Sequence, residues 1–276
     1  MTSERGLYRR LFDLTGRVAV VTGGVGLLGH HFCAGLADHG ASVAVVDLDG
    51  DKCARFAGEL ARMYGTSCLG VGCDITDPQQ VKAMADKVER DLGPIAILHN
   101  NAQGVSRDLD RYFAPTGAYD LETWREVMAV NLDGAFLTAQ EIGGRMAARG
   151  SGSIIQTGSI YGVAGPDQRI YEGSEYNGRP INTPAVYSAS KAGLDGLTRY
   201  LAAYWGHSNV RVNTLTPGGV SSGQNETFDR RYSARVPMDR MAKPAELVGA
   251  LVFLASDASS YVNGQNIVVD GGLAAW

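Results

Sequence analysis

Short runs of β-branched and apolar residues alternate with longer stretches of helical character along almost the whole chain. The runs expected to form strands are 17–22, 42–47, 67–74, 95–100, 153–158, 210–216 and 265–270, and the expected helices are 27–39, 51–64, 78–92, 121–148, 186–206 and 244–256. Strands that are apolar throughout and separated by helices indicate a parallel sheet covered on both faces. The sequence therefore predicts one doubly wound α/β domain at 14–276, with seven parallel strands, after an N-terminal extension at 1–13.

The composition limits the partners of such a domain. Of the 276 residues, 45% are hydrophobic, and the formal net charge is −4, which supplies no broad basic field for nucleic acid or an anionic membrane. No stretch reaches the roughly 18–20 apolar residues that span a bilayer, and the N-terminus lacks the apolar core of a signal peptide. The four cysteines have no metal-binding spacing. We therefore expect a cytoplasmic protein with reduced thiols, no metal and a small-molecule ligand.

A glycine-rich turn joins the first expected strand to the first expected helix. It reads TGGVGLLG at 22–29, and glycine lets such a turn adopt positive φ values and lets the backbone approach a pyrophosphate at the helix N-terminus. Asp47 ends the second strand, where a carboxylate accepts hydrogen bonds from the adenosine ribose hydroxyls. Together these features are typical of a Rossmann-like fold that binds a dinucleotide.

Asp47 also bears on the choice between NAD and NADP. A 2′-phosphate beside this carboxylate would experience like-charge repulsion. No Arg or Lys stands at 24–25 or 48–49 to offset it, although Lys52 and Arg55 lie one turn further on. The sequence therefore predicts that NAD is preferred over NADP.

The three longest irregular stretches, 103–120, 159–184 and 217–243, all follow expected strands. They therefore lie at the carboxyl edge of the sheet, where open α/β sheets bind ligands. We expect 159–184 to form a substrate loop and 217–243 a mobile loop.

Tyr187 and Lys191 lie four residues apart in the helix that follows the second of these stretches, so their side chains share one helix face. An ammonium beside a phenol favours the phenolate, and a tyrosine with an unperturbed pKa of about 10 then works as a base closer to neutral pH. A Tyr–Lys pair at this spacing usually lies on a solvated helix surface without a functional role. Its position after a dinucleotide turn, with Ser159 upstream, makes it a candidate acid–base pair.

Taken together, these motifs resemble the short-chain dehydrogenases/reductases of the compact, single-domain branch. The resemblance extends from about Leu14 to Leu273. It is carried by the glycine turn, Asp74, Asn100, Asn101, Ala102, Asn131, Ser159, Tyr187, Lys191, Pro217, Gly218 and Asp270 to Gly272.

The resemblance implies four catalytic residues. It makes Tyr187 the acid–base group, Ser159 the group that holds the substrate oxygen, and Lys191 the group that lowers the pKa of Tyr187 and binds the nicotinamide ribose. Asn131 is expected to hold a water of the proton relay. These roles imply hydride transfer between a nicotinamide and a secondary alcohol carbon, while Tyr187 takes up or releases the hydroxyl proton.

The resemblance also implies which residues surround the ligands, with Asp74 at the adenine and Asn101 near the adenosine ribose. The expected cofactor-binding residues are Gly23, Val25, Gly26, Leu27, Leu28, Asp47, Leu48, Cys73, Asp74, Ile75, Asn101, Ala102, Gln103, Tyr187, Lys191, Pro217, Gly218, Val220 and Ser222. The expected substrate-binding residues are Gln103, Ser159, Tyr161, Arg169, Tyr187 and Gly219.

Three features depart from the family pattern. Gly26 gives the glycine spacing of the extended branch, which leaves a nucleotide-sugar epimerase or dehydratase as an alternative, although those chains usually carry an added C-terminal lobe. Gln103 replaces a glycine that commonly follows Asn-Asn-Ala, and it either reaches the pocket or caps a loop. Ser159 and Tyr187 are 28 residues apart, about twice the usual interval, so a segment at 162–183 is inserted.

This insertion is rich in polar and aromatic residues, which suit a hydroxyl-rich or charged ligand better than a long acyl chain. A solvated surface loop or a subunit contact is the other interpretation. We therefore predict an NAD(P)-dependent oxidoreductase that interconverts a polar secondary alcohol and a ketone, with a sugar, sugar acid or polyol as substrate, in a homo-oligomer that is a tetramer or a dimer. A 3-oxoacyl-type ketoreductase and a non-catalytic nucleotide-sensing protein are the further alternatives.

Overall fold

The seven predicted strands form one parallel sheet with the order β3-β2-β1-β4-β5-β8-β9. The computed structural model describes residues 6–106, 108–176 and 178–276, so residues 1–5 of the predicted extension and positions 107 and 177 of two predicted loops lie outside the described residues. The strands of the sheet are β1 (Val18–Thr22), β2 (Ser42–Asp47), β3 (Cys68–Gly72), β4 (Ile95–Asn100), β5 (Gly152–Thr157), β8 (Val210–Pro217) and β9 (Asn266–Val269). The predicted doubly wound, single-domain fold is confirmed.

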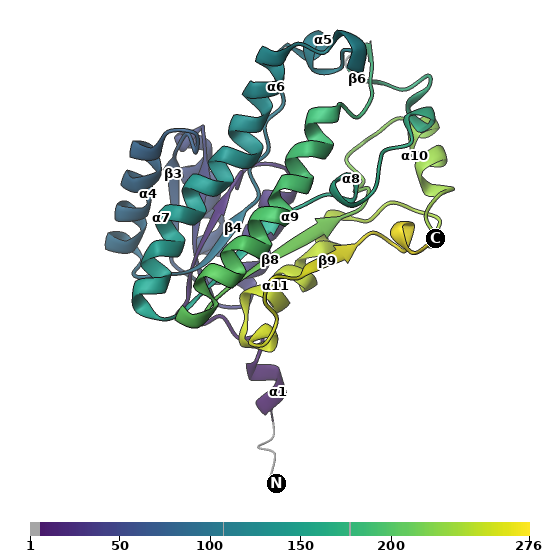
Figure 1. Cartoon of the computed structure of the whole chain (residues 1–276). Coiled ribbons are helices and arrows are strands. Elements are labelled where there is room, and N and C mark those ends of the chain that lie inside the picture. The colour runs from purple at the N-terminus through teal and green to yellow at the C-terminus, as the bar shows by residue number, and fades with distance from the viewer. Residues whose placement is uncertain (1–5, 107, 177) are drawn as a thin grey trace.

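Helices cover both faces of this sheet. One face carries α4 (Pro78–Asp91), α6 (Leu121–Met128), α7 (Gly134–Arg149) and α9 (Ala185–Trp205), and the other carries α2 (Leu27–Asp38), α3 (Gly50–Tyr64) and α11 (Val248–Ala255). In Figure 1, α4, α7 and α9 lie across the face turned to the viewer. The short helix α1 (Leu7–Arg10) projects from the opposite end of the molecule to α10 (Glu226–Ser233).

The uninterrupted apolar pattern of the central strands follows from this double cover. All five residues of β1 are buried. Because successive side chains of a strand point to opposite faces, Val18 and Val20 pack with the α4, α7 and α9 side, whereas Ala19 and Val21 pack with the α2, α3 and α11 side. Val18 to Val21 are thus buried against helices on both faces, so this part of the strand reads as a continuous hydrophobic run that ends at the buried Thr22.

Two predicted helices have a different internal structure. The segment predicted as one helix at 121–148 is divided by a wider π-helical turn at Ala129–Asp133, between α6 and α7. The helix predicted at 244–256 starts as a 3₁₀ turn at Pro244–Leu247 before α11. A π-helical turn is rare in helices and is often found at functional sites. Here it contains Asn131.

The three segments predicted to be irregular contain short elements at the carboxyl edge. They are α5 (Leu109–Tyr112), α8 (Ile160–Val163), the two-stranded hairpin β6 (Glu175–Tyr176) and β7 (Arg179–Pro180), and α10. A separate small core joins the insertion to α10, with Ile170, Phe228, Tyr232, Val236 and Met241 buried together. These elements are too short to produce a hydrophobic period in the sequence, and their packing against each other stabilises them.

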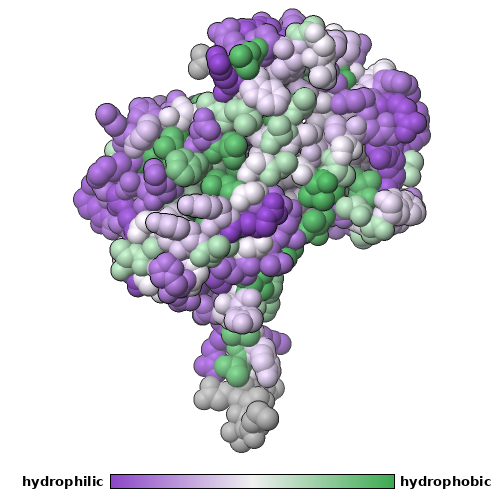
Figure 2. All heavy atoms as spheres, in the orientation of Figure 1, coloured by the Kyte–Doolittle hydropathy of each residue, from purple (hydrophilic) through white to green (hydrophobic). Residues whose placement is uncertain are grey.

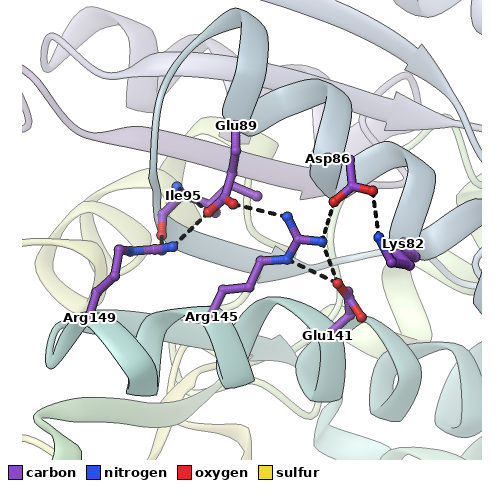
Figure 3. A network of polar contacts seen from close by, with 7 residues as sticks. All are labelled: Lys82, Asp86, Glu89, Ile95, Glu141, Arg145 and Arg149. Carbon is purple, nitrogen blue, oxygen red and sulfur yellow. Dashed lines mark hydrogen bonds and ion pairs between the residues drawn. The ribbon is translucent and has the colours of Figure 1, made fainter.

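A network of charged side chains joins α4 to α7 (Figure 3). Arg145 on α7 donates to Asp86 at 2.6 Å and to Glu89 at 2.9 Å, both on α4, and Arg149 donates to Glu89 at 2.7 Å. The Arg145 side chain is only 20% exposed and that of Glu89 24%. This network therefore lies in a partly desolvated helix interface, where removing one partner leaves the other charges poorly compensated.

Candidate active site

A cavity of about 610 Å³ opens at the carboxyl edge of the sheet, beside the glycine turn and the ends of β2, β3 and β4. Gly26, Leu27 and Leu28, where α2 begins, contribute to its wall. The N-cap of α2 makes no side-chain hydrogen bond. Free backbone N–H groups and the positive end of the helix dipole therefore meet at this wall, an arrangement that favours a phosphate group.

The glycine turn is shaped by close backbone contacts. Gly23 has a φ of 64°, and a Cβ there would lie 2.7 Å from the Ala102 Cα. At Gly29 a Cβ would lie 2.1 Å from the Gly23 carbonyl oxygen, so α2 packs against the turn only because this residue has no side chain. Gly26 differs, since its φ is −76° and a Cβ would meet only the Gly23 oxygen at 3.3 Å. Its missing side chain chiefly leaves room in the cavity.

Asp47 lies at the cavity with both carboxylate oxygens held in place. Its Oδ1 accepts a hydrogen bond from the Leu48 backbone N–H at 2.8 Å, and its Oδ2 accepts one from the Val25 N–H at 3.3 Å. The carboxylate thus connects the end of β2 to the glycine turn. A ligand that enters the cavity meets a negative charge that is fixed in position.

Asn101 and Asp74 also line this cavity, and hydrogen bonds fix both side chains in position. The Asn101 side-chain amide donates to the Thr22 and Gly23 carbonyls at 3.2 and 3.1 Å, which ties the end of β4 to the turn. Asp74 accepts hydrogen bonds from the backbone and the hydroxyl of Thr76. The cavity, the glycine cradle, the open helix N-terminus and the carboxylate at the end of β2 together fit a dinucleotide.

A second cavity, of about 410 Å³, lies next to the first and contains Ser159 and Tyr187 in its wall. The two side chains share this wall. Burial raises the pKa of Tyr187, and hydrogen bonding by the Ser159 hydroxyl partly counteracts this rise. Ser159 is itself fixed as the N-cap of α8, where it accepts the Tyr161 N–H at 3.2 Å.

Lys191 lies behind Tyr187 in the same helix and is 3% exposed. Its Nζ donates to the Thr157 carbonyl at 2.9 Å and lies 5.9 Å from the centre of the Tyr187 ring. Burial lowers the pKa of Lys191 to about 8. Thr157 in turn bonds His99 through its hydroxyl at 2.8 Å. Burial is the largest influence on the pKa of Tyr187 and raises it, so the direction is opposite to the lowering expected from the Lys191 ammonium.

Asn131 connects three segments from inside the π-helical turn. Its Oδ1 accepts the Gly104 N–H at 2.8 Å, and its Nδ2 donates to the Ser190 hydroxyl at 3.2 Å. The Ser190 hydroxyl donates to the Tyr187 carbonyl at 2.9 Å. The turn thus holds the loop after β4 against the helix that carries Tyr187 and Lys191.

These cavities account for most of the predicted ligand-binding residues. The first is lined by Gly23, Gly26, Leu27, Leu28, Asp47, Leu48, Cys73, Asp74, Ile75, Asn101, Ala102 and Gln103. The second is lined by Gln103, Ser159, Tyr161, Tyr187, Gly218 and Gly219. Val25 acts through its N–H on Asp47, whereas Lys191, Pro217, Val220 and Ser222 line neither cavity.

Arg169, predicted to contact the substrate, does not line the second cavity. Its side chain is 84% exposed and forms an ion pair with Asp167 at 2.8 Å. The guanidinium is solvated and its charge is compensated by Asp167, so no interaction in this structure draws it into the second cavity. Arg169 is therefore not brought together with the other predicted substrate residues.

Among the described residues, no helix has the length and apolar character needed to cross a bilayer. In the same part of the chain, no group of three or more His, Cys, Asp or Glu side chains is arranged to hold a metal ion.

Comparison with known proteins fits this geometry. The family model described as short chain dehydrogenase matches residues 17–233. The chain belongs to the short-chain dehydrogenase family. This oxidoreductase is 36% identical over 266 residues to D-threitol dehydrogenase of Mycolicibacterium smegmatis, with 95% of this chain and 94% of that protein covered. It is 35% identical to galactitol 2-dehydrogenase (L-tagatose-forming) of Cereibacter sphaeroides, covering 98% and 99%.

A solved structure is similar as well. The gluconate 5-dehydrogenase of Burkholderia cenocepacia, in complex with NADP and tartrate, superposes on this short-chain dehydrogenase with a TM-score of 0.84 at 34% identity. The match covers 96% of this chain and 98% of that one. The resemblance inferred from the sequence motifs is thus confirmed over nearly the whole chain.

Sequence reasoning missed most of the second cavity of this short-chain dehydrogenase. Its remaining lining residues are Tyr112, Phe113, Ile160, Tyr171, Asn182, Thr183, Pro184, Gln224, Phe228, Tyr232 and Met241. They come from all three long segments after the strands. The one available signal was the aromatic content of the insertion, but nothing in the sequence indicates which of its side chains turn inward.

Proposed function

We propose that this short-chain dehydrogenase interconverts a polar secondary alcohol and its ketone, with a sugar, sugar acid or polyol as substrate and with NAD preferred over NADP. Relatives that are named as threitol and galactitol dehydrogenases, and the similar gluconate 5-dehydrogenase, support this substrate range. All three are dehydrogenases, which favours this reaction over an epimerase or dehydratase and over a 3-oxoacyl-type ketoreductase.

One observation carries the proposal. The Tyr187 phenol and the Ser159 hydroxyl lie together in the wall of the second cavity, which adjoins the cavity that fits a dinucleotide, and hydrogen bonding by Ser159 acts to lower the Tyr187 pKa. An alcohol placed there meets an acid–base group and a hydrogen-bond donor at the same oxygen. Such a pair stabilises the charge that develops on that oxygen as the proton moves.

The residues that would hold the dinucleotide are Gly23, Gly26, Leu27, Asp47 and Asp74 at the first cavity. When bound, its nicotinamide supplies the hydride acceptor or donor for the substrate carbon.

Tyr187 removes the hydroxyl proton in the oxidation direction and returns it in the reduction direction. Ser159 holds the substrate oxygen. Burial raises the Tyr187 pKa, so a positive charge close to the phenol is needed to lower it. The Lys191 ammonium, 5.9 Å from the ring centre, supplies such a charge. Asn131 holds a relay water in this scheme and positions the Tyr187 helix through Ser190.

The NAD preference rests on Asp47. Its two backbone hydrogen bonds prevent the carboxylate from turning away from a 2′-phosphate. The related structure that is described with NADP is an observation on that protein, and it makes a direct measurement on this chain necessary.

We also propose a cytoplasmic homo-oligomer. Large apolar or aromatic side chains are exposed on the outer helices and near the last strand, among them Phe136, Tyr200, Tyr204, Tyr261 and Trp276. Burial of such side chains against a second subunit would stabilise an assembly. Mass measurement in solution tests this, and a monomer at micromolar concentration would contradict it.

The test of function is turnover with a panel of polyols, sugars, sugar acids and ketones, followed through the absorbance of the reduced nicotinamide. Tyr187→Phe should lower kcat by about 10²–10⁴-fold, since it removes the proton acceptor and keeps the ring. Unchanged turnover in this variant would refute the acid–base role. Tight dinucleotide binding by the wild type with no turnover on any panel member would instead indicate a nucleotide-sensing protein.

A further inference from the structure

The second cavity has aromatic walls and no charge. Its lining includes six aromatic side chains besides Tyr187, namely Tyr112, Phe113, Tyr161, Tyr171, Phe228 and Tyr232. None of the described residues that line it is Asp, Glu, Lys, Arg or His. Burial raises the pKa of Tyr232 to about 12 and that of Tyr161 further, so these phenols are neutral at physiological pH. The cavity thus offers rings and neutral polar groups, with no cation for an anionic ligand.

The charged side chains of the insertion do not line the second cavity. Arg169 pairs with Asp167, and Arg179 pairs with Asp110 on α5, where the two side chains are 43% and 70% exposed. Glu172 is exposed as well. In Figure 2 the flank that carries α10 is mainly hydrophilic on its outer surface. The charged residues that suggested a charged ligand from the sequence therefore lie outside the cavity lining, and Asp167 is paired with Arg169 and Arg235, whereas Tyr171 of the same insertion lines the cavity.

Two cations lie near the cavity without lining it. Arg235 acts electrostatically on Tyr161 and Tyr232, but its guanidinium is 3.6 Å from the Asp167 carboxylate, which compensates its charge. Lys191 is buried and directed at the Thr157 carbonyl. Neither is available as a direct partner for a carboxylate deep in this cavity.

Gln103 is the one described residue that lines both cavities. Within the described structure its side-chain amide has no hydrogen-bond partner. Of the other two amides of the second cavity, that of Gln224 is occupied at both ends, since it donates to the Val220 carbonyl and accepts from the Ser222 N–H. Asn182 donates to the Phe113 carbonyl, and its buried Oδ1 has no partner among the described residues. Gln103 is therefore available to donate to and accept from a hydroxyl group at the junction of the two cavities.

We propose that the second cavity selects an uncharged polyol over the corresponding sugar acid, and that Gln103 hydrogen-bonds a hydroxyl next to the reacting carbon. The inference rests on the proposed oxidoreductase function and narrows its substrate class. A carboxylate enclosed by rings and neutral amides loses hydration without gaining a cation, which is costly. A polyol packs its C–H faces on the rings and satisfies its hydroxyls at Gln103 and Ser159.

The first experiment compares pairs that differ only at one terminal carbon, D-glucitol with D-gluconate and galactitol with D-galactonate, in the wild-type enzyme with the preferred dinucleotide. We expect kcat/KM to be at least about 30-fold higher for the better alditol than for its aldonate, the low end of the cost of an unpaired carboxylate. A smaller preference, or a preference for the aldonate, overturns the inference and leaves the proposed function intact. Absence of turnover on the whole panel overturns the proposed function itself.

The second experiment changes the charge and the amide at Gln103. Gln103→Arg should reduce the alditol preference by about tenfold, because it brings a cation to the cavity, whereas the charge-matched control Met63→Arg, at a 72% exposed position on α3, should not change it. Equal effects of the two variants would mean that the net charge of the protein, and not the charge inside the cavity, sets the preference for the alditol over the aldonate.

The amide itself is tested by reduction of dihydroxyacetone and acetone, which differ only in the hydroxyls beside the reacting carbon. Gln103→Ala should lower kcat/KM for dihydroxyacetone about 3–10-fold more than it lowers kcat/KM for acetone, as expected for the loss of one neutral hydrogen bond. Equal losses for the two ketones would show that Gln103 does not contact the neighbouring hydroxyl.

Discussion

Replacing Asp47 by Asn tests whether one fixed charge decides the cofactor. The substitution keeps an oxygen that accepts the Leu48 N–H, now bonded at 2.8 Å, and removes the negative charge. It gives up the weaker bond from Val25, which is 3.3 Å long. The substitution therefore removes one full negative charge while the stronger of the two hydrogen bonds that hold the side chain is kept.

The expected magnitude follows from Coulomb's law. Two unit charges about 4 Å apart repel by about 4 kcal/mol at an effective dielectric constant near 20. Asp47 is partly exposed, so solvent and salt reduce this to roughly a third, or about 1.4 kcal/mol, which is about tenfold in affinity. A 2′-phosphate carries up to about two charges, so tenfold is a lower bound on the discrimination.

The assay is calorimetric titration of the wild type and of Asp47→Asn with NAD and NADP. We expect the wild type to bind NAD at least about tenfold more tightly and the variant to lose most of this ratio by gaining affinity for NADP. High salt should shrink the wild-type ratio. Asp49→Asn is the matched control, because Asp49 caps α3 and pairs with Lys52 outside the cavity. An unchanged ratio in Asp47→Asn, or equal changes in both variants, would refute the repulsion argument.

Three further predictions concern the scaffold. Gly29→Ala should abolish dinucleotide binding and lower the melting temperature, because its Cβ would lie 2.1 Å from the Gly23 carbonyl oxygen. Gly26→Ala should keep the fold and only weaken dinucleotide binding. Similar melting temperatures for the two variants would contradict this. Arg145→Gln should lower the free energy of unfolding, measured by urea titration, by about 1–3 kcal/mol, with turnover retained. Lys87→Gln, which breaks a more exposed ion pair, is the control and should lower it by less than about 0.5 kcal/mol. Equal losses in the two variants would argue that the α4–α7 network does not stabilise the fold. Burial lowers the pKa of His99 from 6.5 to about 3, so at acidic pH the unfolded chain binds a proton that the folded protein does not. Between pH 7 and pH 5 the wild type should therefore lose about 2 kcal/mol more of its free energy of unfolding than His99→Asn. Parallel stability profiles of the two proteins across this pH range would refute this.

Much of the fold could be predicted from the sequence because its signals are local. A strand buried on both faces reads as a continuous apolar run, as β1 does, and a close turn between strand and helix requires glycine at positions such as Gly29. The spacing of Tyr187 and Lys191 likewise fixes them on one helix. These features determined the parallel sheet, the first cavity and the family of the enzyme.

The second cavity depended on contacts between segments far apart in the chain. Tyr171, Phe228 and Tyr112 come from three separate segments after the strands. Tyr171 and Phe228 pack in one small core and Tyr112 packs in another, and only this packing turns the three side chains toward one cavity. Arg169 has the residue type of a ligand partner, but its nearest carboxylate, Asp167, holds it at the surface. The sequence by itself determined which edge of the sheet carries the two cavities, since backbone periodicity and turn geometry are local properties. The tertiary structure decided which side chains surround the substrate, because the direction of a loop side chain is set by the neighbours that bury or pair it.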